Sequence, residues 1–275
     1  MLISFDQVQL SASAAPFNWV VEPGELWAVM GPSASGKSHL LEVVQRLKRP
    51  SSGSVRVFGA TVESDIEIGA RVTPESVAIR VQSSDDIDER VEVLSVLGLW
   101  EVRKSALTKL TQSQRAACQI LPLFLTRGAV LCADGTLDAL DPWVLPGTLA
   151  RLSQRCSKGS SLVAITSRPD IAEALGHLAI MENRSIKVCG PIPELLGSHL
   201  PDQLMVSCDD PSAINGITDS FEVEARAVDG GMVYRAKAGQ ELAARMLTEG
   251  YGRVRAVVHV RHTVQDLLAE IMKPG

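Results

Sequence analysis

The chain has 275 residues, of which 45% are hydrophobic and 4% aromatic, so we expect a sizeable aliphatic core and exclude global disorder. The formal net charge is −5 and there is no long basic run, which argues against nucleic acid as the main partner. The five cysteines are scattered without CxxC spacing, which predicts reduced thiols. The longest apolar run, 120–125, is far shorter than the ~20 residues that cross a bilayer.

Residues 1–198 alternate predicted strands and helices. Leu26 to Met30 is an apolar run without polar alternation, which predicts a strand buried on both faces. A glycine-rich loop and a predicted helix from Ser38 to Leu47 follow it. The further predicted strands are 54–58, 77–81, 129–133, 162–166 and 177–181, and the helices between them are 85–100, 111–125, 146–155 and 170–175. This alternation predicts an α/β fold, a parallel sheet with helices on both faces.

From Gln203 onward the pattern changes to short strands and helices. The predicted strands are 204–207, 221–228, 232–236 and 253–260, the predicted helices are 211–214, 241–249 and 264–272, and a turn is expected at Gly230 and Gly231. This order predicts a small α+β unit, for which a ferredoxin-like fold is one arrangement. We therefore expect two domains, a larger α/β domain at 1–198 and a small accessory domain at 199–275.

One loop matches the phosphate-binding pattern GxxxxGK[ST] in full. It reads Gly31, Pro32, Ser33, Ala34, Ser35, Gly36, Lys37 and Ser38, and His39 follows it. Glycines let the backbone curl so that its N–H groups face phosphate oxygens, and the helix dipole adds positive potential. Lys37 is predicted to reach the β- and γ-phosphates, and Ser38 to ligate Mg²⁺. Because the loop lies between a buried strand and a helix, we predict that it binds Mg-ATP.

The segments around this loop resemble the nucleotide-binding domain of ABC transporters. Val21 to Leu26 looks like the entry to that domain, and Gln82 resembles its Q-loop glutamine. The resemblance gives Gln82 a contact with Mg²⁺ and with a membrane permease. Val130 to Asp134 resembles the Walker B strand, which gives Asp134 a role in binding Mg²⁺. The resemblance covers residues 1–198 and implies a P-loop ATPase of the ABC type.

Three further resemblances concern dimerisation and transport type. Residues 139–142 resemble the D-loop, with Asp141 as its aspartate. The signature motif LSGGQ aligns best with Leu110, Thr111, Gln112, Ser113 and Gln114, and an alternative register puts Gln112 at its last position. In the family this loop approaches the ATP of the opposite subunit, and a serine in place of the second glycine crowds that contact. The tail 261–268 resembles ATPases of ABC-2 type exporters.

The sequence departs from the family where hydrolysis takes place. Gly135 stands where the family has the glutamate that acts as general base, which is typically worth ~10²–10⁴ in rate. Ser167 stands where the family has its switch histidine, and serine is a poor proton acceptor near neutral pH. These replacements predict a degenerate site that binds ATP and hydrolyses it slowly or not at all. Retained activity despite both replacements is the alternative.

Three functions remain open at this stage. The leading hypothesis is an ABC transporter subunit that pairs with a second ATP-binding subunit, identical or different, and attaches to the cytoplasmic face of the membrane through a permease. The stretch from Gln82 to Leu110 is short, which predicts a reduced helical subdomain and leaves a regulatory or scaffold protein as the second hypothesis. A GTPase or kinase is the third, although no [NT]KxD motif for guanine is present. No aromatic residue lies between Asp6 and Phe17 to stack on adenine, which also leaves GTP open as the nucleotide.

Overall fold

The computed structural model describes residues 1–64, 69, 72–208, 214–228, 231–250 and 253–273. The chain folds into two compact units, Met1–Ile192 and Pro193–Gly275. Most of the predicted helix at 211–214 and half of the turn at Gly230 and Gly231 lie outside the described residues. No helix within the described ranges is both long and apolar enough to cross a bilayer.

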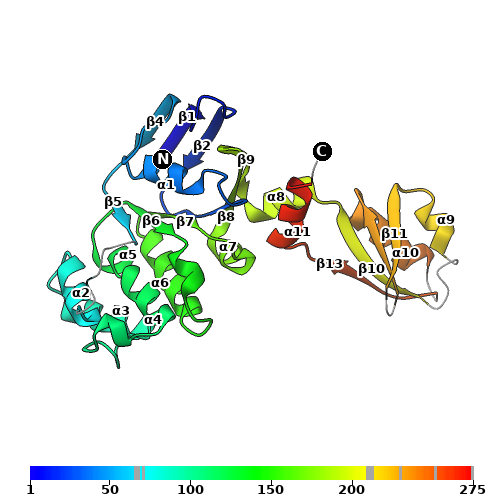
Figure 1. Cartoon of the computed structure of the whole chain (residues 1–275). Coiled ribbons are helices and arrows are strands. Elements are labelled where there is room, and N and C mark those ends of the chain that lie inside the picture. The colour runs from blue at the N-terminus through cyan, green and yellow to red at the C-terminus, as the bar shows by residue number, and fades with distance from the viewer. Residues whose placement is uncertain (65–68, 70–71, 209–213, 229–230, 251–252, 274–275) are drawn as a thin grey trace. The chain divides into compact units, whose positions relative to one another are not determined.

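A six-stranded sheet forms the centre of the first unit (Figure 1), and its strand order is β5-β6-β7-β3-β8-β9. Its strands are β3 (Leu26–Met30), β5 (Thr61–Glu63), β6 (Val130–Asp134), β7 (Ser161–Ile165), β8 (Gly176–Glu182) and β9 (Ser185–Pro191). Neighbouring strands are parallel except in the β8–β9 hairpin. The central strands are almost wholly buried, which explains their continuous apolar sequences. The predicted α/β fold is confirmed.

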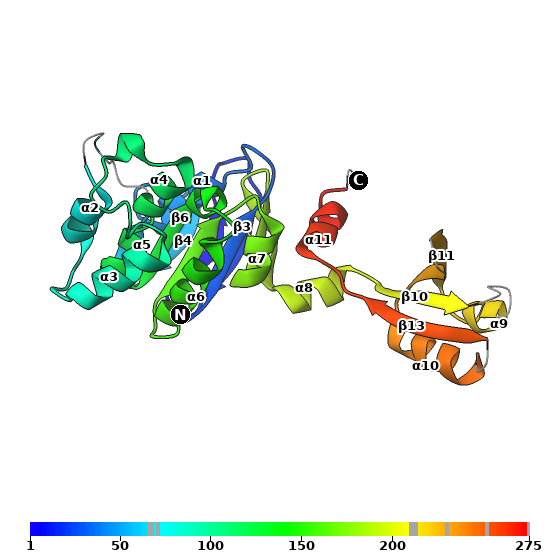
Figure 2. The ribbon, with the colours of Figure 1, turned by 90° about the horizontal axis from the view of Figure 1, so that it is seen from below.

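Helices cover both faces of this sheet. Helix α1 (Lys37–Val44) contacts β6 and β7, while α6 (Leu145–Cys156) contacts β7 and α7 (Pro169–Leu175) contacts β3 and β8. Figure 2, a view from below, shows α6 and α7 packed along the strands of this sheet. The phosphate loop therefore opens at the carboxyl end of a strand that is held on all sides.

A three-stranded antiparallel sheet, in the order β2-β1-β4, packs beside α1. Its strands are β1 (Ile3–Gln9), β2 (Phe17–Val21) and β4 (Ser52–Val57). Although aromatic residues are scarce, four of them meet at its core. The ring centroids of Phe5 and Trp19 are 5.5 Å apart, and those of Trp19 and Trp27 are 5.4 Å apart in an edge-to-face arrangement. These rings join the small sheet to β3, the strand that leads into the phosphate loop.

The helical part of the first unit corrects one sequence prediction. It contains α2 (Pro74–Val81), α3 (Ile87–Val96), α4 (Gln112–Gln119), α5 (Pro122–Leu125) and the 3₁₀ turns η1 (Leu107–Lys109) and η2 (Thr136–Ala139). The predicted strand 77–81 is wrong, because these residues belong to α2. Thr73 and Ser76 form a capping box, and Pro74 occupies the first turn, so local start signals favour the helix. Strand β5 takes the place beside β6 instead.

Between its first and last helices, the second unit has the order β-α-β-β-α-β. Its sheet runs β11-β12-β10-β13, and its neighbouring strands are antiparallel. The elements are α8 (Ile192–His199), β10 (Asp202–Cys208), α9 (Asn215–Thr218), β11 (Val223–Val228), β12 (Gly231–Ala236), α10 (Gly239–Glu249), β13 (Val254–Val260) and α11 (Val264–Ile271). This order and sheet topology are those of a ferredoxin-like fold. Helix α10 buries Leu242 and Met246 against Leu204 and Tyr234 of the sheet.

The aromatic core gives a stability prediction. Trp19 is 2% exposed, so replacing it with alanine leaves a cavity and is expected to lower the free energy of unfolding by about 3–5 kcal/mol. The indole N–H of Trp19 is buried without a hydrogen-bond partner among the described residues. Trp19→Phe removes this N–H and keeps an aromatic ring, so this variant should lose clearly less free energy of unfolding than Trp19→Ala. Denaturant unfolding measures both, and equal losses would contradict the prediction.

Candidate functional site

The phosphate loop passes very close to the end of β8. A Cβ atom on Gly31 would lie 2.1 Å from the carbonyl oxygen of Met181, so only glycine fits there. Gly36 begins α1 with a φ of +99°, which is a conformation that glycine adopts without strain. The two glycines of the motif are thus required by this fold as well as by phosphate binding.

Lys37 is folded over its own loop. Its Nζ donates hydrogen bonds to the carbonyl oxygens of Gly31 at 2.9 Å and Pro32 at 2.7 Å, and to Oγ of Ser35 at 3.3 Å. Burial lowers the pKa of Lys37, and the carboxylate of Asp134 partly opposes this shift. A phosphate group would supply the countercharge that the loop itself lacks.

A hollow of about 470 Å³ lies at the mouth of the loop. It is lined by Ala34, Ser35, Gly36, Lys37, Ser38, His39, Lys48 and Arg184. The structure therefore brings together six of the predicted nucleotide-binding residues, and Gly31, Pro32 and Ser33 complete the loop that leads into them. Three cations and a helix N-terminus facing one hollow form a site that suits a polyanion.

Lys48 and Arg184 were not found by sequence reasoning. Arg184 lies in the turn between β8 and β9, and its N–H donates to the carbonyl oxygen of Ser35 at 2.8 Å. No motif marks Arg184, because it reaches the loop only through the pairing of β8 with β3. Lys48 follows α1 and forms an ion pair with Glu42 at 2.7 Å.

Asp134 and Ser38 supply the oxygen donors that Mg²⁺ prefers. Asp134 is the last residue of β6, Ser38 lies in the first turn of α1, and both residues are exposed. In the described part of the chain, no group of three or more His, Cys, Asp and Glu side chains could hold a metal ion. The residues present therefore fit a Mg²⁺ ion that takes its remaining ligands from phosphate and water.

Gly135 and Ser167 lie just after the carboxyl ends of β6 and β7. Gly135 follows β6 with a φ of +69°, and a Cβ atom there would meet no atom within 4 Å. Its N–H donates to the carbonyl oxygen of Ile165 at 3.0 Å, and Ser167 lies in the loop that follows β7. The carboxyl ends of β6 and β7 are therefore adjacent, with open space where a side chain at position 135 would extend.

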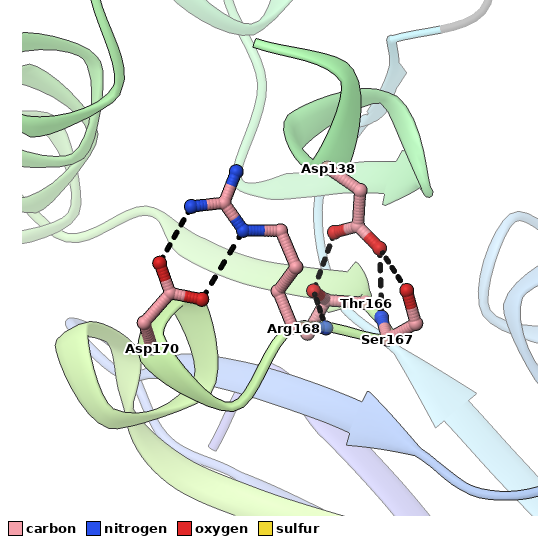
Figure 3. Close-up of polar contacts among 5 residues, drawn as sticks. All are labelled: Asp138, Thr166, Ser167, Arg168 and Asp170. Carbon is pink, nitrogen blue, oxygen red and sulfur yellow. Dashed lines mark hydrogen bonds and ion pairs between the residues drawn. The ribbon is translucent and has the colours of Figure 1, made fainter. Parts of the chain in front are cut away.

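Asp138 is the functional candidate that the sequence analysis missed. Its Oδ2 accepts hydrogen bonds from the N–H and from the hydroxyl of Ser167, both at 2.7 Å (Figure 3). Its Oδ1 accepts a hydrogen bond from the hydroxyl of Thr166. Figure 3 also shows the guanidinium of Arg168 turned toward Asp170, with which it forms a two-point ion pair. No local motif marks this cluster, because η2 and the loop after β7 are far apart along the chain.

The predicted signature segment begins helix α4. Thr111 and Gln114 form a capping box, with Leu110 buried just before them and Gln112 in the first turn. The hydroxyl of Ser113 is buried and accepts a hydrogen bond from the N–H of Asp141 at 2.8 Å. The structure thus brings the signature and D-loop candidates together within one chain.

Gln82, the predicted Q-loop glutamine, lies at the end of helix α2. The expectation that it follows a strand is wrong, because it ends helix α2. Its side chain accepts a hydrogen bond from Nε of Arg90 at 2.7 Å and donates one to the carbonyl oxygen of Asp86 at 2.6 Å. Its amide is therefore held among the helices and is not among the residues that line the hollow at the phosphate loop. Its contact with Mg²⁺ stays a prediction without geometric support.

Comparison with known proteins gives the site a context. A sequence model of the family described as ABC transporter matches residues 15–137. The methionine import ATP-binding protein MetN of Myxococcus xanthus is 26% identical over 86% of this chain and 86% of its own length. MetN of Bifidobacterium longum is 24% identical over 74% of this chain and 57% of that protein. The macrolide export ATP-binding/permease protein MacB of Marinobacter nauticus is 26% identical over 68% of this chain and 32% of that protein.

Solved structures agree on the fold. An ATP-binding subunit of an ABC transporter superposes with a TM-score of 0.60 at 17% identity, over 72% of this chain and 93% of the other. A dimeric ATP-binding cassette with bound ADP and Pi superposes with a TM-score of 0.60 at 16% identity, over 69% of this chain and 98% of the other. The first unit therefore has the fold of these ATP-binding domains, and residues 15–137 within it are similar to the ABC transporter family.

Proposed function

We propose that this chain is an ATP-binding subunit that binds Mg-ATP at Gly31–Ser38, couples that binding to a membrane permease, and hydrolyses ATP slowly or not at all. The observation that carries the proposal is the complete phosphate loop, which opens on a hollow with three cations. Slow hydrolysis is supported by Gly135, which offers no carboxylate at the end of β6. Two copies, or this chain and a second ATP-binding subunit, would enclose the nucleotide.

The direction of transport stays a prediction. The tail at 261–268 favours an ABC-2 type exporter, whereas the relatives are named for methionine import and for macrolide export. We therefore propose the subunit role without a substrate. The second candidate, a regulatory or scaffold protein, is favoured by the short stretch between Gln82 and Leu110, which contains only α3 and η1 as helical segments in its described residues.

A basic hollow near this stretch supports docking on a partner. It measures about 270 Å³ and is lined by Ser83, Ser84, Glu89, Phe124, Leu125, Thr126, Arg127, Arg151, Gln154, Arg155 and Lys158. Arg155 donates hydrogen bonds to the carbonyl oxygens of Leu123 and Thr126, and Arg151 pairs with Glu92 at 2.9 Å. Within the described residues, the side chains of Arg127 and Lys158 form no ion pair. We propose that an acidic segment of the permease occupies this hollow.

Nucleotide binding is the first test. ATP should bind the purified chain, and Lys37→Ala should weaken binding at least about 10-fold, because a hydrogen bond to a charged group is worth about 1.5–3 kcal/mol. Calorimetry measures the affinity, with Lys104→Ala, at an exposed lysine, as the matched control. Turnover should be lower by about 10²–10⁴ than with a general base in place. Absence of ATP binding would overturn the proposal, and ordinary ABC-type turnover lost in Lys37→Ala would overturn the claim of slow hydrolysis.

His39 gives a pH prediction. Its burial, and then the charge of Lys48, lower the pKa of His39 below 6.5, with Arg184 acting in the same direction and Glu42 against it. Bound phosphates raise this pKa, so ATP binding should take up protons near pH 6.5 and affinity should fall as pH rises through that range. Calorimetry in two buffers of different ionisation enthalpy measures the uptake. Equal uptake in His39→Gln would show that another group is responsible.

The docking hollow gives a third test. Arg127→Glu combined with Lys158→Glu reverses the charge of these two cations, so copurification with the permease should be lost while ATP affinity is retained. Lys104→Glu together with Lys109→Glu, two exposed lysines outside the hollow, is the charge-matched control. Unchanged copurification after the first pair of substitutions would exclude this hollow as the docking site.

A further inference from the structure

The loop after β7 is placed by the order of the sheet. Strand β7 lies between β3, which leads into the phosphate loop, and β6, which ends at Asp134. The N–H of Thr166 donates to the carbonyl oxygen of Val29 at 3.2 Å, and the N–H of Gly135 donates to that of Ile165 at 3.0 Å. Because neighbouring strands are about 4.8 Å apart, Ser167 lies between the phosphate loop and the Mg²⁺ candidate Asp134.

The hydroxyl of Ser167 has only one proton to donate. Oδ2 of Asp138 accepts from that hydroxyl and from the N–H of the same residue, both at 2.7 Å. A carboxylate is an acceptor only, so the hydroxyl proton is committed to Asp138. Ser167 is exposed, and its Oγ therefore presents lone pairs to the site. It can accept a hydrogen bond from a water molecule but has no proton left to donate to a phosphate.

Nothing nearby neutralises Asp138 by a direct ion pair in the described structure. Arg168 interacts electrostatically with Asp138, but its Nε donates to Oδ1 of Asp170 at 3.1 Å and its Nη2 bonds to Oδ2 of that same carboxylate. The turn that carries Asp138 is fixed by its own N–H, which donates to the carbonyl oxygen of Gly135 at 3.1 Å. The cluster therefore holds the carboxyl group of Asp138 in a fixed position beside Ser167 (Figure 3).

We propose that Asp138 and Ser167 act as a pair that accepts the proton of the attacking water, in place of the carboxylate missing at Gly135; this rests on the proposed ATP-binding function. The water oxygen forms a bond to the γ-phosphorus while the bond from that phosphorus to the β–γ bridging oxygen breaks. The water proton passes to Oγ of Ser167, whose own proton passes to Oδ2 of Asp138 and then to solvent. ADP, phosphate and one proton result. Ser167 is the contacting residue, and Asp138 is the positioning residue that acts through it.

The relay predicts that hydrolysis is slow rather than absent. Two proton transfers through a hydroxyl replace one direct transfer to a carboxylate, and the hydroxyl is a weak base until Asp138 takes its proton. Asp134 is occupied by its role toward Mg²⁺, which leaves Asp138 as the carboxylate that is joined by hydrogen bonds to the end of β7.

The test compares four variants of the full chain with the parent. Asp138→Asn and Ser167→Ala should each lower kcat by about 10²-fold, with KM and ATP affinity within about 2-fold of the parent. Asp85→Asn, at an exposed aspartate outside this cluster, should keep the parental kcat. In the nucleotide-free protein, Asp138→Ala should raise hydrogen exchange at the Ser167 amide, whereas Asp85→Asn should not.

Each of the following outcomes would overturn the proposed role of Asp138 and Ser167. An unchanged kcat in Asp138→Asn excludes the relay, and a kcat loss that comes with an equal loss of ATP affinity or thermal stability shows a merely structural contact. A parental chain that binds ATP but has no turnover above Lys37→Ala also overturns it, and leaves the proposed function standing. A chain that does not bind ATP overturns both the proposed pair and the proposed function.

Discussion

The position of β7 between β3 and β6 decides which loops of this protein can act together. Parallel strands bring their carboxyl ends to one edge, so the phosphate loop, the loop at Ser167 and the end of β6 at Asp134 share that edge without any direct sequence link. The pairing is rigid because the three strands are almost fully buried. The aromatic core at Trp19 and Trp27 then fixes β3 against the small sheet.

Electrostatics at this edge are arranged around an anion that the chain itself does not supply. Lys37, Lys48 and Arg184 face one hollow, and the N-terminus of α1 adds its partial positive charge. Burial lowers the pKa of both Lys37 and His39, so the site by itself disfavours its own positive charges. A bound polyphosphate relieves this cost, whereas a neutral ligand would not. The site therefore recognises the negative charge of the phosphates more than the identity of the nucleobase. This agrees with the absence of an aromatic residue between Asp6 and Phe17 that could stack on the nucleobase.

Sequence reasoning found the features that depend on local pattern. The phosphate loop, the buried strands and the α/β fold could be predicted because apolar runs and glycine spacing are properties of short segments. The prediction of a strand at 77–81 was wrong because a short apolar run fits a strand or a helix equally well, and only the capping box at Thr73 favours the helix. Arg184 and Asp138 could not be predicted, since each reaches the site across strand pairings distant in sequence. The roles of Gln82 and the signature residues stay predictions.

The missing side chain at position 135 and the carboxylate at 138 belong to one local structure. Gly135 turns the chain from β6 into η2 with a φ of +69°, a conformation that costs other residues about 1–2 kcal/mol. That turn brings Asp138 back to the end of β7, where it meets Thr166 and Ser167. A side chain at position 135 would extend into open space but would adopt this φ only at that cost. Gly135 therefore offers no carboxylate of its own, but it makes the turn that leads to the carboxylate of Asp138.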